Sequence, residues 1–174
     1  VLAFVKKYPG FMLNILGISL IFICVYMNTT FLIHIMNAIH AGSKEQGITL
    51  AIAAICELIS MSMFSRISKN FRVEALLRLS CVFCVLKVVL VYFAQSTIGV
   101  YLAQLIQMIS YAVFLPASVY YVNNVVDSTD IAQGQSMMTG AILAANVFAS
   151  VIGGALIEKY GIRSTLGFGI MLSI

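Results

Sequence analysis

The sequence contains few charged residues, only two prolines and no tryptophan. Lys, Arg, Asp and Glu make up 9% of the 174 residues, whereas soluble domains carry about 25%. Hydrophobic residues account for 61%, and the mean hydropathy is +1.04. A chain of this composition cannot cover itself with polar surface in water, which excludes an ordinary soluble domain. The lipid bilayer is the solvent that fits it.

The common motifs of catalysis and metal binding are also missing. There is no Gly-x-Ser-x-Gly, no His-Glu-x-x-His and no Asp-rich metal motif. His34 and His40 are six residues apart and point to different faces of a helix, which argues against a metal pair. We therefore expect no enzyme activity, no cofactor and no bound metal.

Four cysteines, Cys24, Cys56, Cys81 and Cys84, all lie within apolar runs. The last two form a Cys-x-x-Cys, a spacing that can indicate metal or redox chemistry. No second pair and no nearby histidine completes such a site. The sequence favours buried free thiols on helices.

Basic residues give the chain a net charge of +4, which raises the question of nucleic acid. They do not form a stripe interleaved with exposed aromatic residues, so we expect no nucleic-acid partner. Instead they lie mostly between apolar runs, where basic residues set membrane orientation. One side of the membrane would hold six of them and the other three: Lys6, Lys7, Arg66, Lys69, Arg72 and Arg78 against Lys44, Lys159 and Arg163. This asymmetry predicts that the chain starts on the cytoplasmic side.

Five apolar runs reach the roughly 20 residues that a helix needs to cross a bilayer. They are residues 11–36, 47–65, 75–94, 98–122 and 131–157, and a shorter run covers 165–174. Short polar connections make consecutive helices antiparallel neighbours. The runs are apolar on all sides, which excludes the alternating pattern of a β-barrel. The sequence predicts an all-α, multi-pass membrane bundle over 1–174, in which Pro116 kinks the fourth helix. Because it starts at Val1 and stops within an apolar run, we expect both ends to be cut from a longer chain.

Small residues recur every fourth position in the fifth run, at Ala141, Ala145, Ala149 and Gly153. This spacing lets two helix backbones approach closely in lipid. Chance is the alternative, because alanine and glycine are common in such helices.

The chain also has an internal repeat. The basic connection at 69–72 and the one at 159–163 each follow the second helix of a triplet, and they lie 90 positions apart. Three spans per repeat make the two copies inverted in the membrane. Inverted three-helix repeats are characteristic of secondary transporters.

Two segments resemble major facilitator superfamily transporters. Residues 153–163 (GGALIEKYGIR) resemble the end of the eleventh helix and the loop after it. Residues 65–72 (SRISKNFR) resemble the basic loop between helices eight and nine, with Ser65 where the family signature has Asp. The resemblance is closest to the oligosaccharide or sugar:proton symporter and sugar-efflux branch. It implies half of a major facilitator fold, from helix seven to part of helix twelve, with a separate N-terminal six-helix half.

Two charged residues lie at lipid depth: Glu57 in the second run and Lys87 in the third. A charge at mid-bilayer costs about 2.5–3.5 kcal/mol, so such residues usually pair or line a water-filled path. Their depths differ by roughly 6 Å at 1.5 Å per residue, which predicts a pair formed directly or through water. The pair either holds two helices together or includes a carboxylate that exchanges a proton.

A resemblance to the lactose permease branch supports the second alternative, a carboxylate that exchanges a proton. There, charged residues on the eighth and ninth helices take part in sugar binding and proton coupling, and Glu57 and Lys87 resemble them. That branch also has a His and a Glu on its tenth helix, which the fourth run here lacks. Glu57 would then carry more of the coupling.

Neutral polar side chains form further candidates for substrate contacts. At about 100° per residue, four residues of the fourth run fall within roughly 60° of one another. They are Gln104, Gln107, Tyr111 and Ser118. Gln135, Thr139 and Asn146 share a face of the fifth run, and Asn28 lies near the outer end of the first. Amides and phenols suit a neutral polyhydroxyl ligand, but the same groups can instead hydrogen-bond between helices.

These observations predict a secondary active transporter in the cell membrane. It would move a small polar solute, such as a sugar, by alternating access and with proton coupling. The expected partners are the solute, the proton, the bilayer and the missing half. A drug or metabolite efflux permease of the same fold and a non-transporting receptor or subunit remain as alternatives, because a fold does not fix a function.

Overall fold

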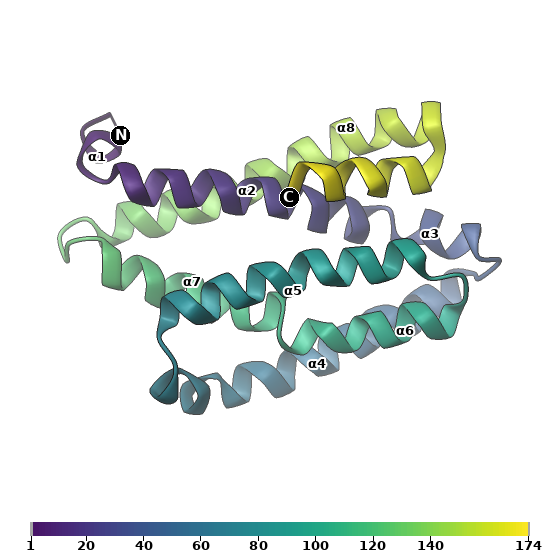
Figure 1. Ribbon diagram of the computed structural model, residues 1–174, viewed down its shortest axis with the longest axis horizontal. Coiled ribbons are helices and arrows are strands. Elements are labelled where there is room, and N and C mark those ends of the chain that lie inside the picture. The colour runs from purple at the N-terminus through teal and green to yellow at the C-terminus, as the bar shows by residue number, and fades with distance from the viewer. Residues whose placement is uncertain (1, 174) are drawn as a thin grey trace.

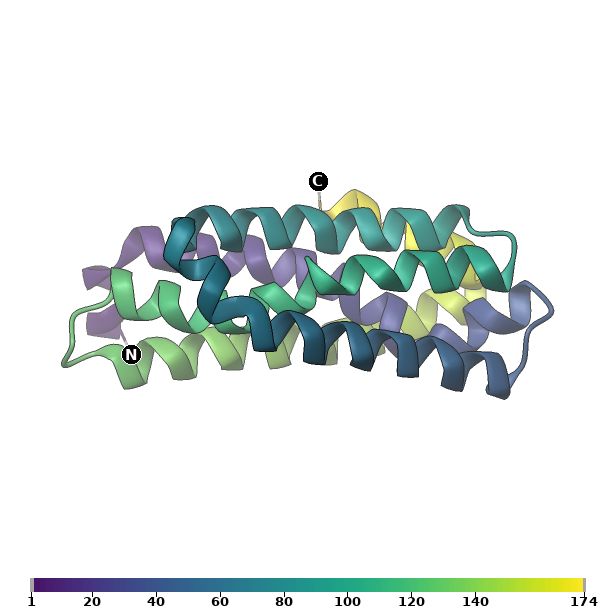
Figure 2. The ribbon, with the colours of Figure 1, turned by 90° about the horizontal axis from the view of Figure 1, so that it is seen from below.

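The computed structural model describes residues 2–173, and within this range the protein consists of helices and short connections, without strands. Figure 1 shows the helices lying roughly along one long axis. The turned view in Figure 2 shows the same elongated bundle from another side. The elements are α1 (Leu2–Lys7), α2 (Pro9–Thr30), α3 (Leu32–Ala38), α4 (Ser43–Asn70), α5 (Val73–Phe93), α6 (Thr97–Leu105), the 3₁₀ helix η1 (Ile106–Met108), α7 (Tyr111–Val125) and α8 (Ile131–Ser173).

The five predicted spans are confirmed. Five helical stretches are long and apolar enough to cross a membrane: Pro9–Thr30, Ser43–Asn70, Val73–Phe93, Thr97–Val125 and Ile131–Ser173. All-α architecture is therefore correct, and successive spans run in opposite directions along the bundle (Figure 1). The boundaries differ from prediction mainly where a helix is interrupted or bent.

The first interruption separates α2 from α3 at Phe31, within the predicted helix 11–36. The Phe31 ring packs against Gly153 of α8, where an added Cβ atom would lie 2.4 Å from the ring carbon Cε2. This tertiary contact depends on residues far apart in the sequence. Hydrophobic periodicity therefore could not reveal it.

The second interruption lies in the fourth span at Ser110, six residues before Pro116, where a kink was predicted. The chain leaves helical geometry at Ser110, where ψ is −107°, and α7 then continues through Pro116. Proline lacks an N–H and crowds the carbonyl four residues before it, which here belongs to Ala112. The chain is interrupted just before that crowded turn, so the break lies on the N-terminal side of the proline.

A third feature is the sharp bend of α8 at Gly161, where φ is +79° and ψ is 171°. A positive φ of this kind favours glycine, which has no Cβ. Residues 162–173 fold back along the bundle, as the yellow end of the chain in Figure 1 shows. Leu166 joins Cys24 and Val88 in one hydrophobic cluster, so the returning segment packs against α2 and α5.

The small residues of α8 do pack against a neighbouring helix, as predicted. Ala145 and Ala149 are almost fully buried in the cluster that contains Phe11, Ile15 and Phe22 of α2. Gly153 is buried beneath Phe31. The stripe therefore allows close approach of α2 and α8.

The four cysteines are buried and free, as the sequence predicted for thiols that lie on membrane helices.

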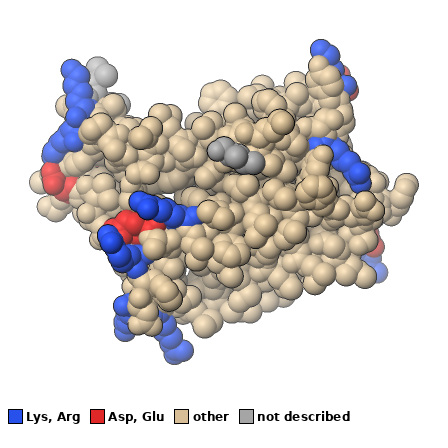
Figure 3. Space-filling view, viewed as in Figure 1, with Lys and Arg blue, Asp and Glu red and all other residues tan. Residues whose placement is uncertain are grey.

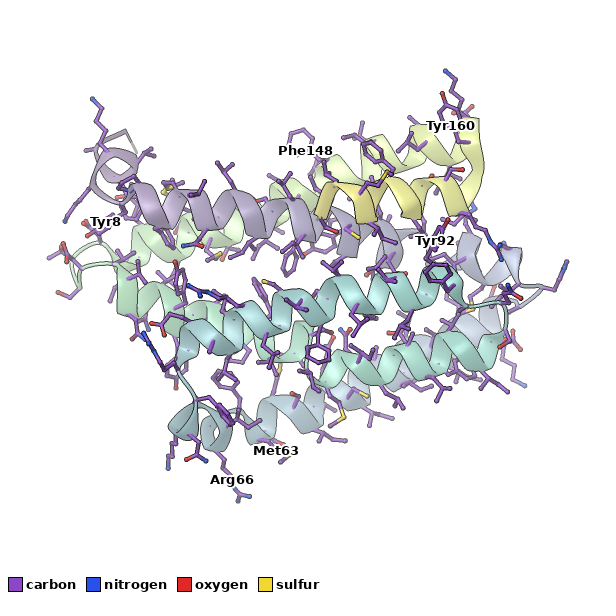
Figure 4. All side chains as sticks on the ribbon, in the orientation of Figure 1. Tyr8, Met63, Arg66, Tyr92, Phe148 and Tyr160 are labelled. Atoms are coloured by element: carbon purple, nitrogen blue, oxygen red, sulfur yellow. The ribbon has the colours of Figure 1, made fainter. Side chains whose placement is uncertain are left out.

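The outer surface suits lipid. Large apolar side chains such as Leu13, Leu58 and Met171 are 73%, 72% and 82% exposed. Figure 3 shows Lys, Arg, Asp and Glu gathered toward the two ends of this face, with an uncharged band between them. Tyr8 lies toward one end of the bundle and Tyr92 and Tyr160 toward the other (Figure 4). This is the distribution of a multi-pass integral membrane protein.

One end of the bundle is held by a polar clamp between the start of the chain and the α7–α8 connection. Lys7 Nζ lies 2.8 Å from an Asp127 carboxylate oxygen and 2.7 Å from one of Asp130. Tyr8 donates a hydrogen bond to Asp130 at 3.0 Å. The hydrogen bonds from Lys7, and then from Tyr8, hold the pKa of both Asp carboxyls below their usual range.

Replacing Gly153 by alanine should destabilise the bundle, because the new methyl group would collide with the Phe31 ring. Overpacking of this kind costs about 1–3 kcal/mol. We expect the melting temperature in detergent to fall by several degrees. Gly154→Ala is the matched control, since nothing lies within 4 Å of its added Cβ. Equal melting temperatures for the two variants would show that the Phe31 contact does not constrain the bundle.

The clamp should stabilise the bundle only when its carboxylates are ionised. A folded-state pKa below the unfolded value, which is about 3.9 for Asp, gives stability above that pH that is lost as the pH falls. Asp130→Asn should therefore lower the melting temperature slightly at pH 7, and this difference should vanish at low pH. The exposed Glu158 provides the control Glu158→Gln. A decrease for Asp130→Asn that is independent of pH would exclude an ionic contribution.

Candidate functional site

A polar cavity of about 170 Å³ lies among α2, α3, α4, α5, α6 and η1. Its wall combines polar side chains with small and apolar ones. The lining residues are Asn28, Thr29, Leu32, Leu50, Ala53, Ala54, Glu57, Lys87, Gln104 and Gln107. Five of the eight predicted site residues therefore meet at one cavity.

Interrupted helices supply several of these side chains. Asn28 lies in the last turn of α2 before the break at Phe31, and Gln107 lies in η1 before the break at Ser110. Discontinuous membrane helices often form binding sites, because their ends expose polar groups within the bundle. Glu57 and Lys87, in contrast, come from the interiors of the continuous helices α4 and α5.

Gln107 connects the two charged residues. Lys87 Nζ donates to Gln107 Oε1 at 2.6 Å, and Gln107 Nε2 donates to Glu57 Oε1 at 2.6 Å. The predicted association of Glu57 with Lys87 is thus made through the Gln107 side chain, and the two charged groups form no direct ion pair. No helical-wheel argument indicated this role, because Gln107 was expected to face a ligand.

The bridge suits its charges. The amide presents its N–H group to the carboxylate and its carbonyl oxygen to the ammonium, and hydrogen bonds to ionised groups are short and strong. Lys87 is only 9% exposed, so its ammonium needs such a partner. Glu57 is half-buried and lines the cavity. The arrangement keeps both charges at lipid depth with no net formal charge.

Two other amides in the wall have unused hydrogen-bonding capacity. Asn28 and Gln104 are 2% and 3% exposed. Among the described residues, neither Asn28 Oδ1 nor Gln104 Oε1 has a hydrogen-bond partner. A buried acceptor left unpaired costs about 1–3 kcal/mol, so both oxygens favour a state in which a donor reaches them.

Three predicted site residues lie outside the cavity lining. Tyr111 packs against Phe22 at a ring distance of 6.0 Å. Gln135 donates to the Val119 carbonyl, and Asn146 accepts a hydrogen bond from Ser150 at 3.5 Å. Tyr111 and Gln107 do not share a face as predicted, because the helix between them is interrupted.

Ser60 is a site-supporting residue that the sequence did not single out. Its hydroxyl donates to the backbone carbonyl of Met108, at the end of η1. The bond ties α4 to the interrupted segment that carries Gln107. A serine in an apolar helix is the only signal in the sequence, and it does not identify the partner.

Across residues 2–173 the protein has five membrane-length helices, and four of these spans surround a cavity that holds an engaged carboxylate and ammonium. These features define a multi-pass membrane protein with a polar site in its interior. The family model described as Major Facilitator Superfamily matches residues 15–174. The chain belongs to that superfamily, and its fold is a partial major facilitator fold. It is accordingly a membrane transporter of this superfamily. Comparison with curated proteins gives no match.

Gln107→Leu should destabilise the protein by removing both links of the bridge. Hydrogen bonds to charged groups contribute about 1.5–3 kcal/mol each, and the variant leaves two charges without this partner. We expect a clearly lower melting temperature in detergent. Gln95→Leu, in the exposed connection between α5 and α6, provides the control.

A triple variant tests whether charge, rather than lost volume, causes the effect. Replacing a buried charged network by apolar residues is often neutral or stabilising. Combining Gln107→Leu with Glu57→Leu and Lys87→Met should therefore recover stability relative to Gln107→Leu alone. If the triple variant melts lower still, the bridge is not what Gln107 contributes.

Proposed function

We propose that this transporter moves a small, neutral, polar solute, such as a sugar, by proton-coupled alternating access. The observation that carries the proposal is the cavity in which Glu57 is linked through Gln107 to Lys87. A carboxylate at lipid depth is expensive, so its placement on a cavity wall favours a functional role over a purely structural one.

Proton coupling is supported by the surroundings of Glu57. Its carboxylate is half-buried and faces a cavity, where water can deliver a proton. Lys87 supplies a balancing positive charge through the bridging amide, so the ionised form is tolerated. Protonation would leave a neutral acid beside an engaged ammonium. The site thus has two charge states that differ by one proton.

The choice of a neutral solute rests on the other wall residues. Asn28, Gln104 and Gln107 are amides, each of which can both donate and accept hydrogen bonds. Hydroxyl groups have the same dual character. The formal charges of Glu57 and Lys87 cancel, so a singly charged solute gains no net attraction. Neutral compounds that carry hydroxyl groups therefore match the hydrogen-bond donors and acceptors of the cavity wall.

We further propose that the chain is the C-terminal half of a twelve-helix transporter, with its start on the cytoplasmic side. The repeat of basic connections 90 positions apart supports two inverted triplets. A second six-helix unit would complete the cavity, and the two units would rock about it. The helix interruptions at Phe31 and Ser110, beside the cavity, supply places where such a movement can bend the chain.

Glu57→Gln in the full-length protein should abolish solute accumulation driven by a pH gradient. The amide cannot exchange a proton, so accumulation of a radiolabelled sugar in proteoliposomes should fall at least about tenfold, the equivalent of 1.4 kcal/mol. Exchange of labelled for unlabelled sugar, which needs no net proton movement, should persist. Glu158→Gln at the exposed end of the bundle is the control.

Other results assign other functions. Unchanged accumulation by Glu57→Gln would remove this residue from the coupling mechanism. If a pH gradient drives sugar only out of the compartment that corresponds to the cytoplasm, the protein is an efflux permease. Saturable binding of sugar without flux would indicate a receptor of the same fold.

A further inference from the structure

The bridging glutamine has a definite direction. Its N–H end contacts Glu57 and its oxygen contacts Lys87, each at 2.6 Å. This direction suits an ionised carboxylate, which only accepts hydrogen bonds. Once Glu57 is protonated it becomes a neutral and weaker acceptor, while the ammonium still holds the other end of the amide. Protonation therefore weakens one bond of the bridge and spares the other.

An alternative acceptor for the released N–H group is present in the same wall. Gln104 precedes Gln107 by three residues along α6 and η1, and both line the cavity. Gln104 Oε1 is buried and unpaired, as is Asn28 Oδ1 on the α2 side of the cavity. Leaving these two buried oxygens unpaired costs free energy, and a hydrogen bond from the Gln107 N–H group would remove that cost.

Together these contacts describe two hydrogen-bonding states of one side chain. We propose that Gln107 is a proton-sensing positioning residue, which bonds to Glu57 when that carboxylate is ionised and turns its N–H group to the unpaired amide oxygens of the cavity when it is protonated. This inference rests on the proposed proton coupling and adds how a proton on Glu57 alters the solute cavity. The proton comes from water in the cavity.

Other titratable groups near the bridge must be separated from Glu57. They are the thiols of Cys56 on α4 and Cys84 on α5 and the phenols of Tyr26 on α2 and Tyr111 on α7. Glu57→Gln identifies any response that does not come from Glu57.

The inference can be tested without a known solute. Ala53 lines the cavity on the α4 helix that carries Glu57, so Ala53→Cys in the full-length protein provides a reporter. The probe is a small water-soluble maleimide, applied between pH 4 and 8 and corrected for the reagent's own pH dependence with free cysteine. Labelling of the parent protein without the reporter measures the contribution of the four buried native cysteines.

The difference between a charged and a neutral acceptor, about 1 kcal/mol, shifts the population of the turned Gln107 side chain about fivefold. Ala53 and Gln107 line the same cavity, so the corrected labelling rate of the Ala53→Cys reporter should follow that population across the pH series. Glu57→Gln should hold the rate at the low-pH value throughout. Gln107→Leu should give a rate that no longer depends on pH. Gln104→Leu leaves Glu57, Gln107 and Lys87 in place but removes one receiving oxygen, and it should reduce the response. Gln95→Leu should keep the full response.

Two results would overturn the inference. One is a full response in Gln107→Leu, and the other is a labelling rate of the Ala53→Cys reporter protein, with Glu57 and Gln107 intact, that does not change with pH. Should Gln107→Leu fail to fold, the double variant Asn28→Leu with Gln104→Leu decides, since an unreduced response there excludes both receiving oxygens. The proposed transport is tested separately, because proton-driven accumulation that depends on Glu57 can persist when the labelling response is absent.

Discussion

The protein must hold a carboxylate and an ammonium at lipid depth, and the solution it uses is an amide placed between them. A bare charge in this environment costs several kcal/mol, and even a direct ion pair can lose more solvation than it gains. Gln107 gives each charge a hydrogen bond of 2.6 Å. Because Glu57, Lys87 and Gln107 come from α4, α5 and η1, this bridge also fixes three elements around the cavity. The position of the cavity wall thus follows from the need to satisfy these two charges.

The interrupted helices face a related constraint, because polar backbone groups in lipid also need hydrogen-bond partners. A regular helix leaves no backbone group free, whereas a break in lipid exposes carbonyl and amide groups that need partners. The Ser60 hydroxyl provides such a partner for the Met108 carbonyl at the end of η1. On the opposite wall, the close approach of Phe31 to Gly153 accompanies the break between α2 and α3. Each interruption is therefore supported by a contact from another helix, and both border the polar cavity.

This dependence on distant contacts explains what the sequence could and could not predict. Apolar run length is a local property, and it located five spans and the connections between them. Scarcity of charge in those runs made Glu57 and Lys87 stand out, and the structure brings them to one cavity with Asn28, Gln104 and Gln107. Tyr111 is not among the residues that line this cavity, because the chain is interrupted at Ser110, whereas helical-wheel arithmetic assumes a continuous helix. The sequence also could not reveal the role of Gln107, which depends on two residues that are 50 and 20 positions away.

A bridging amide differs from a direct ion pair in what happens when the carboxylate gains a proton. In a direct pair, protonation removes the partner of the buried ammonium, and the cost of the unpaired Lys87 would oppose the step. With Gln107 between them, the ammonium donates to Gln107 Oε1 and not to the carboxylate, so a proton on Glu57 does not remove that partner. The charge on Lys87 still favours ionised Glu57 across the bridge, but it does not have to break its own contact. In the proposed mechanism, the intervening glutamine therefore lets Glu57 change its protonation state while Lys87 stays hydrogen-bonded. This property distinguishes, in the proposed mechanism, a site that exchanges a proton from a salt bridge that only fastens two helices together.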